Sequence, residues 1–350
     1  MKFTAGVSLF AAVASAISVD LTKRDSPLDV KLEMVGNTAV KASITNTGAS
    51  DLKVFKTGTF LDENSPTEKV AIYQGNSQLE FDGIRLRVST AGLGEEAFQT
   101  IAAGETVEAT FDVGQVYDLS AGGKYDVVSL GALSYAEANT TDLVGIHSVS
   151  GSTVTAEVDG AAAKEVRRRF HAKRIDVQDC TGTKLTATNT AISNCRALAA
   201  AAQTAASSGS ATKVTEYFKS STSTTRSTVA AVFGRIVTEC GSTSSGASDL
   251  YCSDVYSSCS SGVLAYTLPS QSYMVNCPLY FSALPALSRT CHAQDQATTT
   301  LHESTHLTQI KGTSDYGTYG YSGVQGLSAS QNLNHADTYA LFANAIYVGC

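Results

Sequence analysis

The distribution of cysteines along the chain restricts its fold more than any other feature. The chain has eight cysteines, and all of them lie after residue 174. An even number of cysteines in an exported chain predicts disulfide bonds. The sequence therefore predicts two parts, of which only the C-terminal one is cross-linked. No Cys-x-x-Cys pair occurs, which argues against a second metal site built from thiolates.

Residues 1–18 have the pattern of a secretory signal peptide. Lys2 supplies a positive charge, residues 6–13 form a short apolar run, and residues 14–16 are small enough for a cleavage site. A membrane-spanning helix needs about 20 apolar residues, and Asp20 closes this run much earlier. We therefore expect a secreted, extracellular protein without a membrane anchor.

A basic run at residues 167–174 separates the part without cysteines from the part with them. Such runs are usually solvated linkers. This run, however, ends in Lys173 and Arg174 at the cysteine boundary, and a dibasic pair in an exposed linker is a target for processing proteases. We expect a signal peptide at 1–18, a propeptide at 19–174 and a mature domain at 175–350, with cleavage after Arg174.

Hydrophobic patterning differs between the two parts. In the first part, segments of alternating polar and apolar residues lie between turns that contain glycine and asparagine, at residues 29–34, 39–44, 108–113 and 124–128. In the second, apolar residues recur at helical spacing, over residues 192–206, 212–217, 227–239 and 328–348. The sequence predicts an α+β protein in which a β-sandwich-like propeptide precedes a mainly helical domain with disulfides.

Residues 302–306 form the only His-Glu-x-x-His in the chain. Positions four apart lie on the same face of an α-helix, so His302 and His306 can bind one zinc ion at about 2.0–2.1 Å. Zinc lowers the pKa of a bound water towards about 7, and the neighbouring Glu303 can accept its proton as the water attacks a peptide carbonyl. This pattern predicts metal-assisted hydrolysis of peptide bonds.

The same five residues can arise by chance on a solvated amphipathic helix. The context argues against that reading, because residues 298–300 offer threonine caps for a helix start and Leu301 and Leu307 give the helix an apolar side. We therefore favour the zinc site over two solvated histidines.

A catalytic zinc site needs a third protein ligand and an open position for water. No glutamate follows Glu303, and the only later carboxylates are Asp315 and Asp337. Residues 309 and 312 are glutamine and glycine, where a metzincin has glycine and histidine. The third ligand is therefore expected to be an aspartate.

The segments around this motif resemble a known family, the deuterolysin group of fungal secreted zinc endopeptidases, or aspzincins, which includes the peptidyl-lysine metalloendopeptidases. The segments that carry the resemblance are His-Glu-Ser-Thr-His at 302–306, Gly-Thr-Ser-Asp at 312–315, Tyr-Gly-Tyr at 319–321 and Asn-His-Ala-Asp-Thr-Tyr at 334–339. The resemblance is close over the C-terminal half. Over the N-terminal half it extends only to the general organisation of a precursor.

The resemblance implies a zincin-type domain in which Asp315 is the third zinc ligand and a nearby tyrosine polarises the substrate carbonyl. Tyr319 is our candidate, although it lies four residues after Asp315 instead of the family's three, so Tyr316 and Tyr321 remain alternatives. Asp337 either binds zinc or lines the pocket that receives a basic side chain. We favour the pocket, so Asp337 is our candidate substrate-binding residue.

The resemblance also implies two of the disulfides. These are Cys180 with Cys252 and Cys259 with Cys277. The pairing of Cys195, Cys240, Cys291 and Cys350 stays open, although a bond between Cys291 and Cys350 would tie the C-terminus beside the zinc helix.

Together these observations predict a secreted neutral zinc metalloendopeptidase, made as an inactive preproenzyme, with one Zn²⁺ per chain. Its expected partners are protein and peptide substrates, especially basic ones, and its own propeptide, and we expect a monomer. The net charge of −7 argues against nucleic acid as a partner, and we expect no membrane partner. The alternative is a secreted, disulfide-rich binding module in which zinc is structural.

Overall fold

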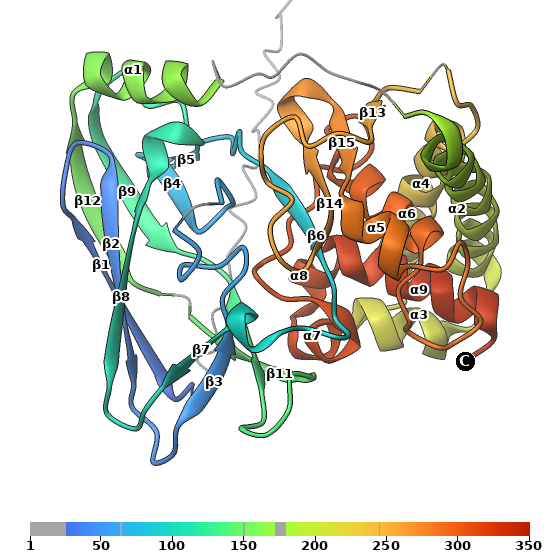
Figure 1. The fold of residues 1–350 in the computed structure, drawn as a ribbon, viewed down its shortest axis with the longest axis horizontal. Coiled ribbons are helices and arrows are strands. Elements are labelled where there is room, and N and C mark those ends of the chain that lie inside the picture. Colours follow the sequence, from blue (N-terminus) through green and yellow to red (C-terminus); the bar gives the residue numbers. More distant parts are fainter. Residues whose placement is uncertain (1–25, 64, 150, 172–179, 245) are drawn as a thin grey trace, which may run out of the picture.

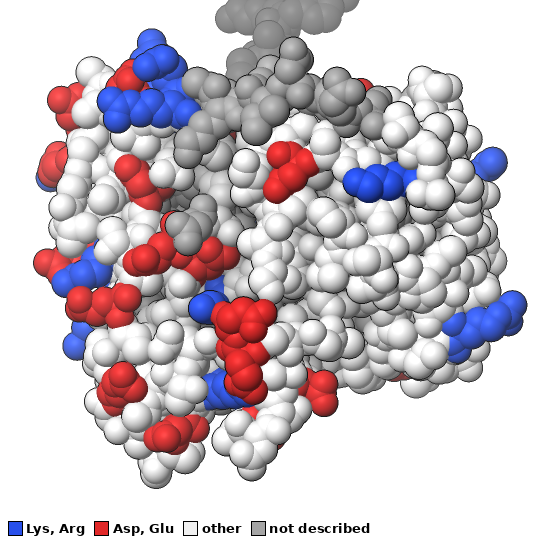
Figure 2. Space-filling model, in the orientation of Figure 1, with Lys and Arg blue, Asp and Glu red and all other residues white. Residues whose placement is uncertain are grey.

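The structure is a computed structural model that describes residues 26–63, 65–149, 151–171, 180–244 and 246–350. The predicted signal peptide and the processing pair Lys173 and Arg174 lie outside the described residues. Figure 1 shows the N-terminal half as strands on one side of the molecule and the C-terminal half mainly as helices on the other. In Figure 2, most charged side chains on the same face lie over the N-terminal half. Within the described ranges, no helix is both long and apolar enough to cross a bilayer.

Antiparallel strands make up most of the N-terminal half, as the alternation of residues predicts. The first sheet contains β1 (Leu28–Met34), β2 (Ala39–Asn46) and β8 (Thr106–Asp112). The second contains β11 (Leu143–Ser148), β10 (Ala132–Ala136), β3 (Leu52–Phe55) and β7 (Phe98–Ile101), and the third β12 (Thr153–Val158), β9 (Gly123–Ser129), β4 (Val70–Gln74) and β5 (Ser77–Gln78). Along β1 and β2 every second side chain is buried, which places one face of each strand on a shared apolar core.

The first part of the basic run, residues 167–171, is helical, whereas the predicted cleavage site after Arg174 lies outside the described residues. Helix α1 (Gly160–His171) includes three of its arginines. Arg167 forms an ion pair with Asp82, and Arg168 and Arg169 lie 2.8 and 3.0 Å from Glu165. Ion pairs between residues three and four positions apart in a helix offset the charge of neighbouring arginines. Helix α1 can therefore extend through these arginines to His171.

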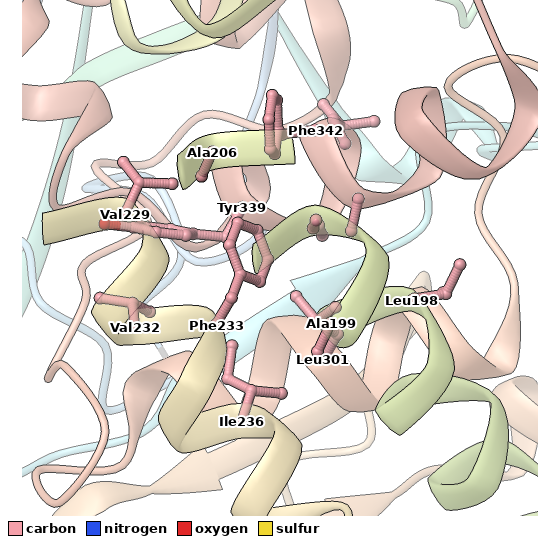
Figure 3. Packing of buried hydrophobic residues seen from close by; sticks show 14 of the residues in the cluster. Leu198, Ala199, Ala206, Val229, Val232, Phe233, Ile236, Leu301, Tyr339 and Phe342 are labelled. Carbon is pink, nitrogen blue, oxygen red and sulfur yellow. The ribbon is translucent and has the colours of Figure 1, made fainter. Parts of the chain in front are cut away.

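Eight helices form most of the C-terminal half. They are α2 (Gly182–Ser208), α3 (Ala211–Phe218), α4 (Ser223–Glu239), α5 (Pro278–Ala283), α6 (Gln296–His306), α7 (Gly320–Gly326), α8 (Ala329–Asn332) and α9 (Ala336–Val348), among the described residues. Their apolar faces meet in the core drawn in Figure 3, where Phe233 packs edge-on against Tyr339 at 5.5 Å between ring centroids and Leu301 of α6 reaches the same cluster. This core anchors α6 from one side.

The predicted helix over residues 328–348 is in fact two helices. The chain leaves helical geometry between α8 and α9, and His335 has the extended conformation φ −117°, ψ 122°. Its backbone pairs with Ser314, and its ring contacts the carbonyl of Thr318 at 3.1 Å. The interruption therefore joins the start of α9 to the loop that follows α6.

Four disulfides lie within the C-terminal half. They join Cys180 to Cys252, Cys195 to Cys240, Cys259 to Cys277 and Cys291 to Cys350. The first and third are the pairs that the resemblance implies, and the last fixes the C-terminus to the loop before α6. Cross-links of this kind mainly restrict the unfolded chain.

A fourth sheet combines strands from both halves, which the sequence did not predict. Its order is β13 (Asp249–Tyr251), β15 (Tyr273–Asn276), β14 (Val263–Leu268) and β6 (Arg85–Val88). Strand β6 comes from the N-terminal half and runs antiparallel to β14. An apolar cluster containing Phe55, Leu86, Tyr266 and Tyr319 joins the halves around it. Short 3₁₀ turns complete the described elements, at Glu95–Ala97, Val113–Gln115 and Pro269–Gln271.

Candidate active site

Helix α6 begins one turn earlier than the threonines suggested as caps. Asp295 is the N-cap, and its carboxylate accepts a hydrogen bond from the Thr298 backbone N–H at 2.6 Å while the Thr298 hydroxyl bonds back to the Asp295 backbone. This reciprocal capping box satisfies N–H groups that would otherwise be buried without partners. Every residue of α6 is buried, and His302 and His306 are 0% exposed, so two solvated histidines are excluded.

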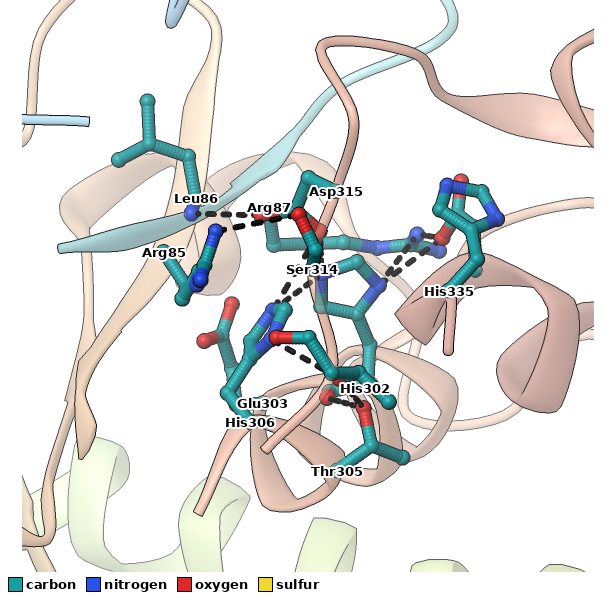
Figure 4. Close-up of polar contacts among 12 residues, drawn as sticks. Arg85, Leu86, Arg87, His302, Glu303, Thr305, His306, Ser314, Asp315 and His335 are labelled. Carbon is teal, nitrogen blue, oxygen red and sulfur yellow. Dashed lines mark hydrogen bonds and ion pairs between the residues drawn. The ribbon is translucent and has the colours of Figure 1, made fainter. Parts of the chain in front are cut away.

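Three potential metal ligands, the triad of His302, His306 and Asp315, converge at the C-terminal end of α6. His302 Nε2 lies 3.1 Å from His306 Nε2, and Asp315 Oδ1 lies 3.3 and 3.4 Å from these two nitrogens. Ligand atoms about 2.0–2.1 Å from a tetrahedral zinc are separated by about 3.3–3.4 Å. Asp315 Oδ1 is buried and has no hydrogen-bond partner. The donor set, its spacing and this unpaired oxygen all fit a zinc ion (Figure 4).

Asp315 reaches the site because the chain reverses after α6. Gly312 and Gly317 have φ angles of 66° and 67°, a left-handed conformation that glycine adopts without strain. The other cluster of possible ligands in the described chain is Cys291, His292 and Cys350, but both of its thiols form a disulfide.

A second layer of contacts orients the two histidines. His306 Nδ1 donates to the Thr313 carbonyl at 3.0 Å, and His302 Nδ1 donates to Asp337 Oδ1 at 3.0 Å. The backbone N–H of Gly320 donates to Asp337 Oδ2 at 2.6 Å. These bonds assign the proton to Nδ1 and leave both Nε2 lone pairs facing the ligand site. Asp337, which is 0% exposed, therefore lies behind a histidine and outside the ligand cluster.

The electrostatics of Asp315 and His302 favour the protonation states that bind a metal ion. Burial alone would raise the pKa of Asp315, but the nearby His306 and His302 outweigh it and hold that pKa well below its usual range. Burial, with help from Arg87, lowers the pKa of His302 well below its usual value. A carboxylate facing a neutral imidazole is the form in which both groups bind a cation.

Glu303 follows His302 on α6, and the charge of Asp315 acts on its carboxyl group. Its Oε2 accepts a hydrogen bond from the Thr267 hydroxyl of β14 at 2.6 Å, whereas Oε1 is buried without a partner. Burial raises the pKa of Glu303 well above its usual value, although the Thr267 hydrogen bond acts against this. A bound cation would lower that pKa again. One oxygen is thus positioned and the other is available to exchange a proton.

The structure separates the three candidate tyrosines. The Tyr321 hydroxyl donates to Glu216 at 2.8 Å, on α3, and the Tyr316 hydroxyl accepts from Asn334 at 3.2 Å. Tyr319 is 2% exposed, and burial raises its pKa well above the usual value, as do the charges of Asp315 and Glu303. Of the three tyrosines, Tyr319 is therefore the one on which the charges of Asp315 and Glu303 act.

Two arginines that sequence reasoning missed also reach the site, both from β6. Arg87 forms an ion pair with Asp337, and its Nη1 lies 3.1 Å from His302 Nδ1. Burial lowers the pKa of Arg87 to about 10, so it remains charged at neutral pH. Arg85 pairs with Glu68 and donates to the Ser314 hydroxyl at 3.2 Å. The strand-like sequence Ile-Arg-Leu-Arg-Val at 84–88 was the available signal, since its arginines share one face.

Comparison with known proteins gives clear matches over the whole chain. The sequence profile of the deuterolysin metalloprotease (M35) family matches residues 1–350. A neutral protease 2 homolog from Colletotrichum graminicola is 60% identical over 352 residues and one from Phaeosphaeria nodorum 57% over 357, each covering 100% of both chains. The solved structure of a zinc peptidase from Grifola frondosa aligns with 47% of this chain and 97% of its own, at 23% identity and a TM-score of 0.40. This last likeness is too distant to inform the geometry of the site.

Proposed function

Since the chain belongs to the deuterolysin metalloprotease (M35) family and is a metalloprotease, we propose that it is a secreted neutral endopeptidase whose zinc ion is held by His302, His306 and Asp315. The observation that carries this proposal is the convergence of two Nε2 atoms and the unpaired Asp315 Oδ1 at the separations of a tetrahedral site. Three protein ligands leave the fourth position of a tetrahedral zinc site open for water. Catalysis requires this open position, whereas a structural zinc site has protein ligands at all four positions. Family membership and this open position disfavour the binding module with structural zinc.

The residues of the chain supply the proton transfers and the orientation. A bound zinc ion would contribute Lewis acidity at the triad. Glu303 Oε1, held in place through Thr267, takes the proton of the attacking water and later delivers it to the leaving amine. The Tyr319 hydroxyl, kept protonated by burial, donates a hydrogen bond to the oxygen of the scissile carbonyl.

The preference of the site is for basic side chains. Asp337 holds a guanidinium group at the site in this structure, that of Arg87, with both groups fully buried. A lysine or arginine of a protein or peptide substrate would form the same type of charge pair. Asp337 therefore has two roles in this proposal, to orient His302 and to receive a basic residue.

The precursor organisation is part of the same proposal. Residues 1–18 are the signal peptide, and residues 19–174 are a propeptide whose three sheets pack in a sandwich-like manner. Residues 175–350 are the mature, processed enzyme, which forms by a cut after Arg174 and removal of the N-terminal fragment. All cysteines lie in the mature part, which supports its separate existence outside the cell. The enzyme carries one zinc ion and acts as a monomer.

Metal analysis of the processed enzyme tests this function. We expect one zinc per chain, loss of proteolysis with 1,10-phenanthroline and recovery on addition of zinc. Asp315→Ala should bind no zinc and show no proteolysis. Full proteolysis in protein stripped of metal would refute the proposal.

A further inference from the structure

Strand β6 occupies the edge of β14 that faces the ligand triad. Arg85 is paired with Thr267, Leu86 with Tyr266 and Arg87 with Ala265, in antiparallel register. The opposite edge of β14 is paired with β15 of its own half. An extended peptide commonly binds a protein by adding a strand to such an edge, where main-chain hydrogen bonds hold it. The N-terminal half therefore places its own chain where an extended peptide can bind beside Glu303, whose partner Thr267 lies on β14.

Leu86 and Arg87 of β6 contact the site directly. The backbone N–H of Leu86 donates to Asp315 Oδ2 at 3.2 Å. Arg87, which is 1% exposed, pairs with Asp337 and lies beside His302 Nδ1. Figure 4 shows Leu86 next to Asp315 and the Arg87 side chain extending past His302 towards the start of α9. The strand thus contacts both a metal ligand and the carboxylate that orients another.

Contacts on either side hold this strand in place. The Ser314 hydroxyl donates to Glu68 Oε2 at 2.9 Å, and Arg85 contacts both of these residues. Leu86 and Val88 enter the apolar cluster shared by the two halves. The backbone contact between β6 and the triad is made by the Leu86 N–H, whereas the substrate group that hydrolysis polarises is a carbonyl oxygen. The strand therefore blocks the site.

We propose that β6 is a built-in inhibitor that occupies the place of an extended substrate, with Arg87 as the side chain that holds Asp337. The inference rests on the proposed function. None of its contacts depends on a covalent link between the halves, because they join residues 68–88 to residues 263–337 non-covalently. A cut after Arg174 therefore leaves the halves associated and the enzyme latent until β6 is itself removed.

The test uses the zinc-loaded, full-length precursor, cut at Arg174 in vitro. Three quantities are measured on each variant: co-elution of the two fragments in size-exclusion chromatography, zinc content, and cleavage of a reporter peptide. We expect cut wild-type protein to co-elute and remain latent. Arg87→Ala should weaken fragment association and raise the rate of cleavage by about 30-fold or more, since it breaks a buried charge pair. Arg87→Lys keeps the positive charge, so its fragment association and cleavage rate should lie between those of wild type and Arg87→Ala.

The matched control is Arg169→Ala, an exposed arginine of the same half that pairs with Glu165, and it should behave as wild type. A second measurement does not depend on folding of the variant precursor. A peptide of residues 81–92 is titrated by calorimetry into processed enzyme that was cut from wild-type precursor and then separated from its N-terminal fragment. The version with Arg87→Ala should bind about 30-fold more weakly.

Two results would overturn the inference: a co-eluting wild-type complex that is fully active, or equal binding of the two peptides. Failure of the proposed function looks different, because zinc-loaded enzyme would then not cleave the reporter even after the fragments are separated. Co-elution and peptide binding would still decide whether β6 occupies the site.

Discussion

Replacing Asp337 by alanine should lower zinc affinity without removing a zinc ligand. Asp337 is fully buried, accepts from His302 Nδ1 at 3.0 Å and is itself held by the Gly320 N–H at 2.6 Å. Loss of such a partner behind a metal-binding histidine costs about 10–100-fold in affinity, which is about 1.4–2.7 kcal/mol. Asp315→Ala, which removes a ligand, should cost far more. Asp337→Asn keeps an acceptor for His302 and should lie within about tenfold of wild type.

Competition against a chromophoric chelator measures these affinities on processed enzyme. Cleavage is measured in parallel on peptides that carry lysine or leucine after the scissile bond, and Asp337→Ala and Asp337→Asn should lose the preference for lysine. Asp249→Asn, a substitution at an exposed carboxylate of β13, is the control. Unchanged zinc affinity in Asp337→Ala would refute the orienting role. A loss as complete as in Asp315→Ala would make Asp337 a ligand.

Three further predictions concern other buried groups. Glu303→Gln should keep zinc and lose about 10²–10⁴-fold in kcat, because an amide cannot accept the proton; near-normal turnover with zinc bound would exclude Glu303 as the base. Asp295→Ala removes the capping box of α6 and should lower the free energy of unfolding by about 2 kcal/mol, measured by denaturant titration; an unchanged midpoint would contradict this. Burial lowers the pKa of Lys69 in the N-terminal half from 10.5 to about 8, against the opposing effect of Asp62. Protonated Lys69 therefore opposes folding below pH 8, and the precursor should gain up to about 3 kcal/mol between pH 8 and 10.5 from this group, a gain that Lys69→Met should abolish.

The features encoded in short stretches of sequence were predicted well. The alternation at residues 29–34 and 39–44 reappears as β1 and β2, and the four-residue spacing of the histidines reappears as one buried face of α6. Asp315 follows His306 closely, so a glycine-containing turn is enough to bring it back. The strands and the shared histidine face needed only local geometry, whereas the choice of Asp315 over Asp337 rested on the family resemblance.

Apart from the two disulfides that the resemblance implied, the features that depend on distant pairing were not predicted. Arg87 contacts a histidine 215 positions away, and no periodicity in β6 indicates that its partner strand belongs to the other half. The break before α9 was missed for a similar reason. Alanine-rich helical spacing continues through it, and only the pairing of His335 with Ser314 reveals the competing interaction.

The complete burial of α6 has a consequence for the rate of metal exchange. In the precursor both histidines are 0% exposed and β6 lies across the ligand site, so a chelator can reach a bound ion only when the halves separate. Zinc should therefore be acquired before the halves close on each other and leave the precursor far more slowly than the processed enzyme. Isotope exchange with labelled zinc would report the opening rate of the precursor directly, since the ion can be replaced only as often as the molecule opens.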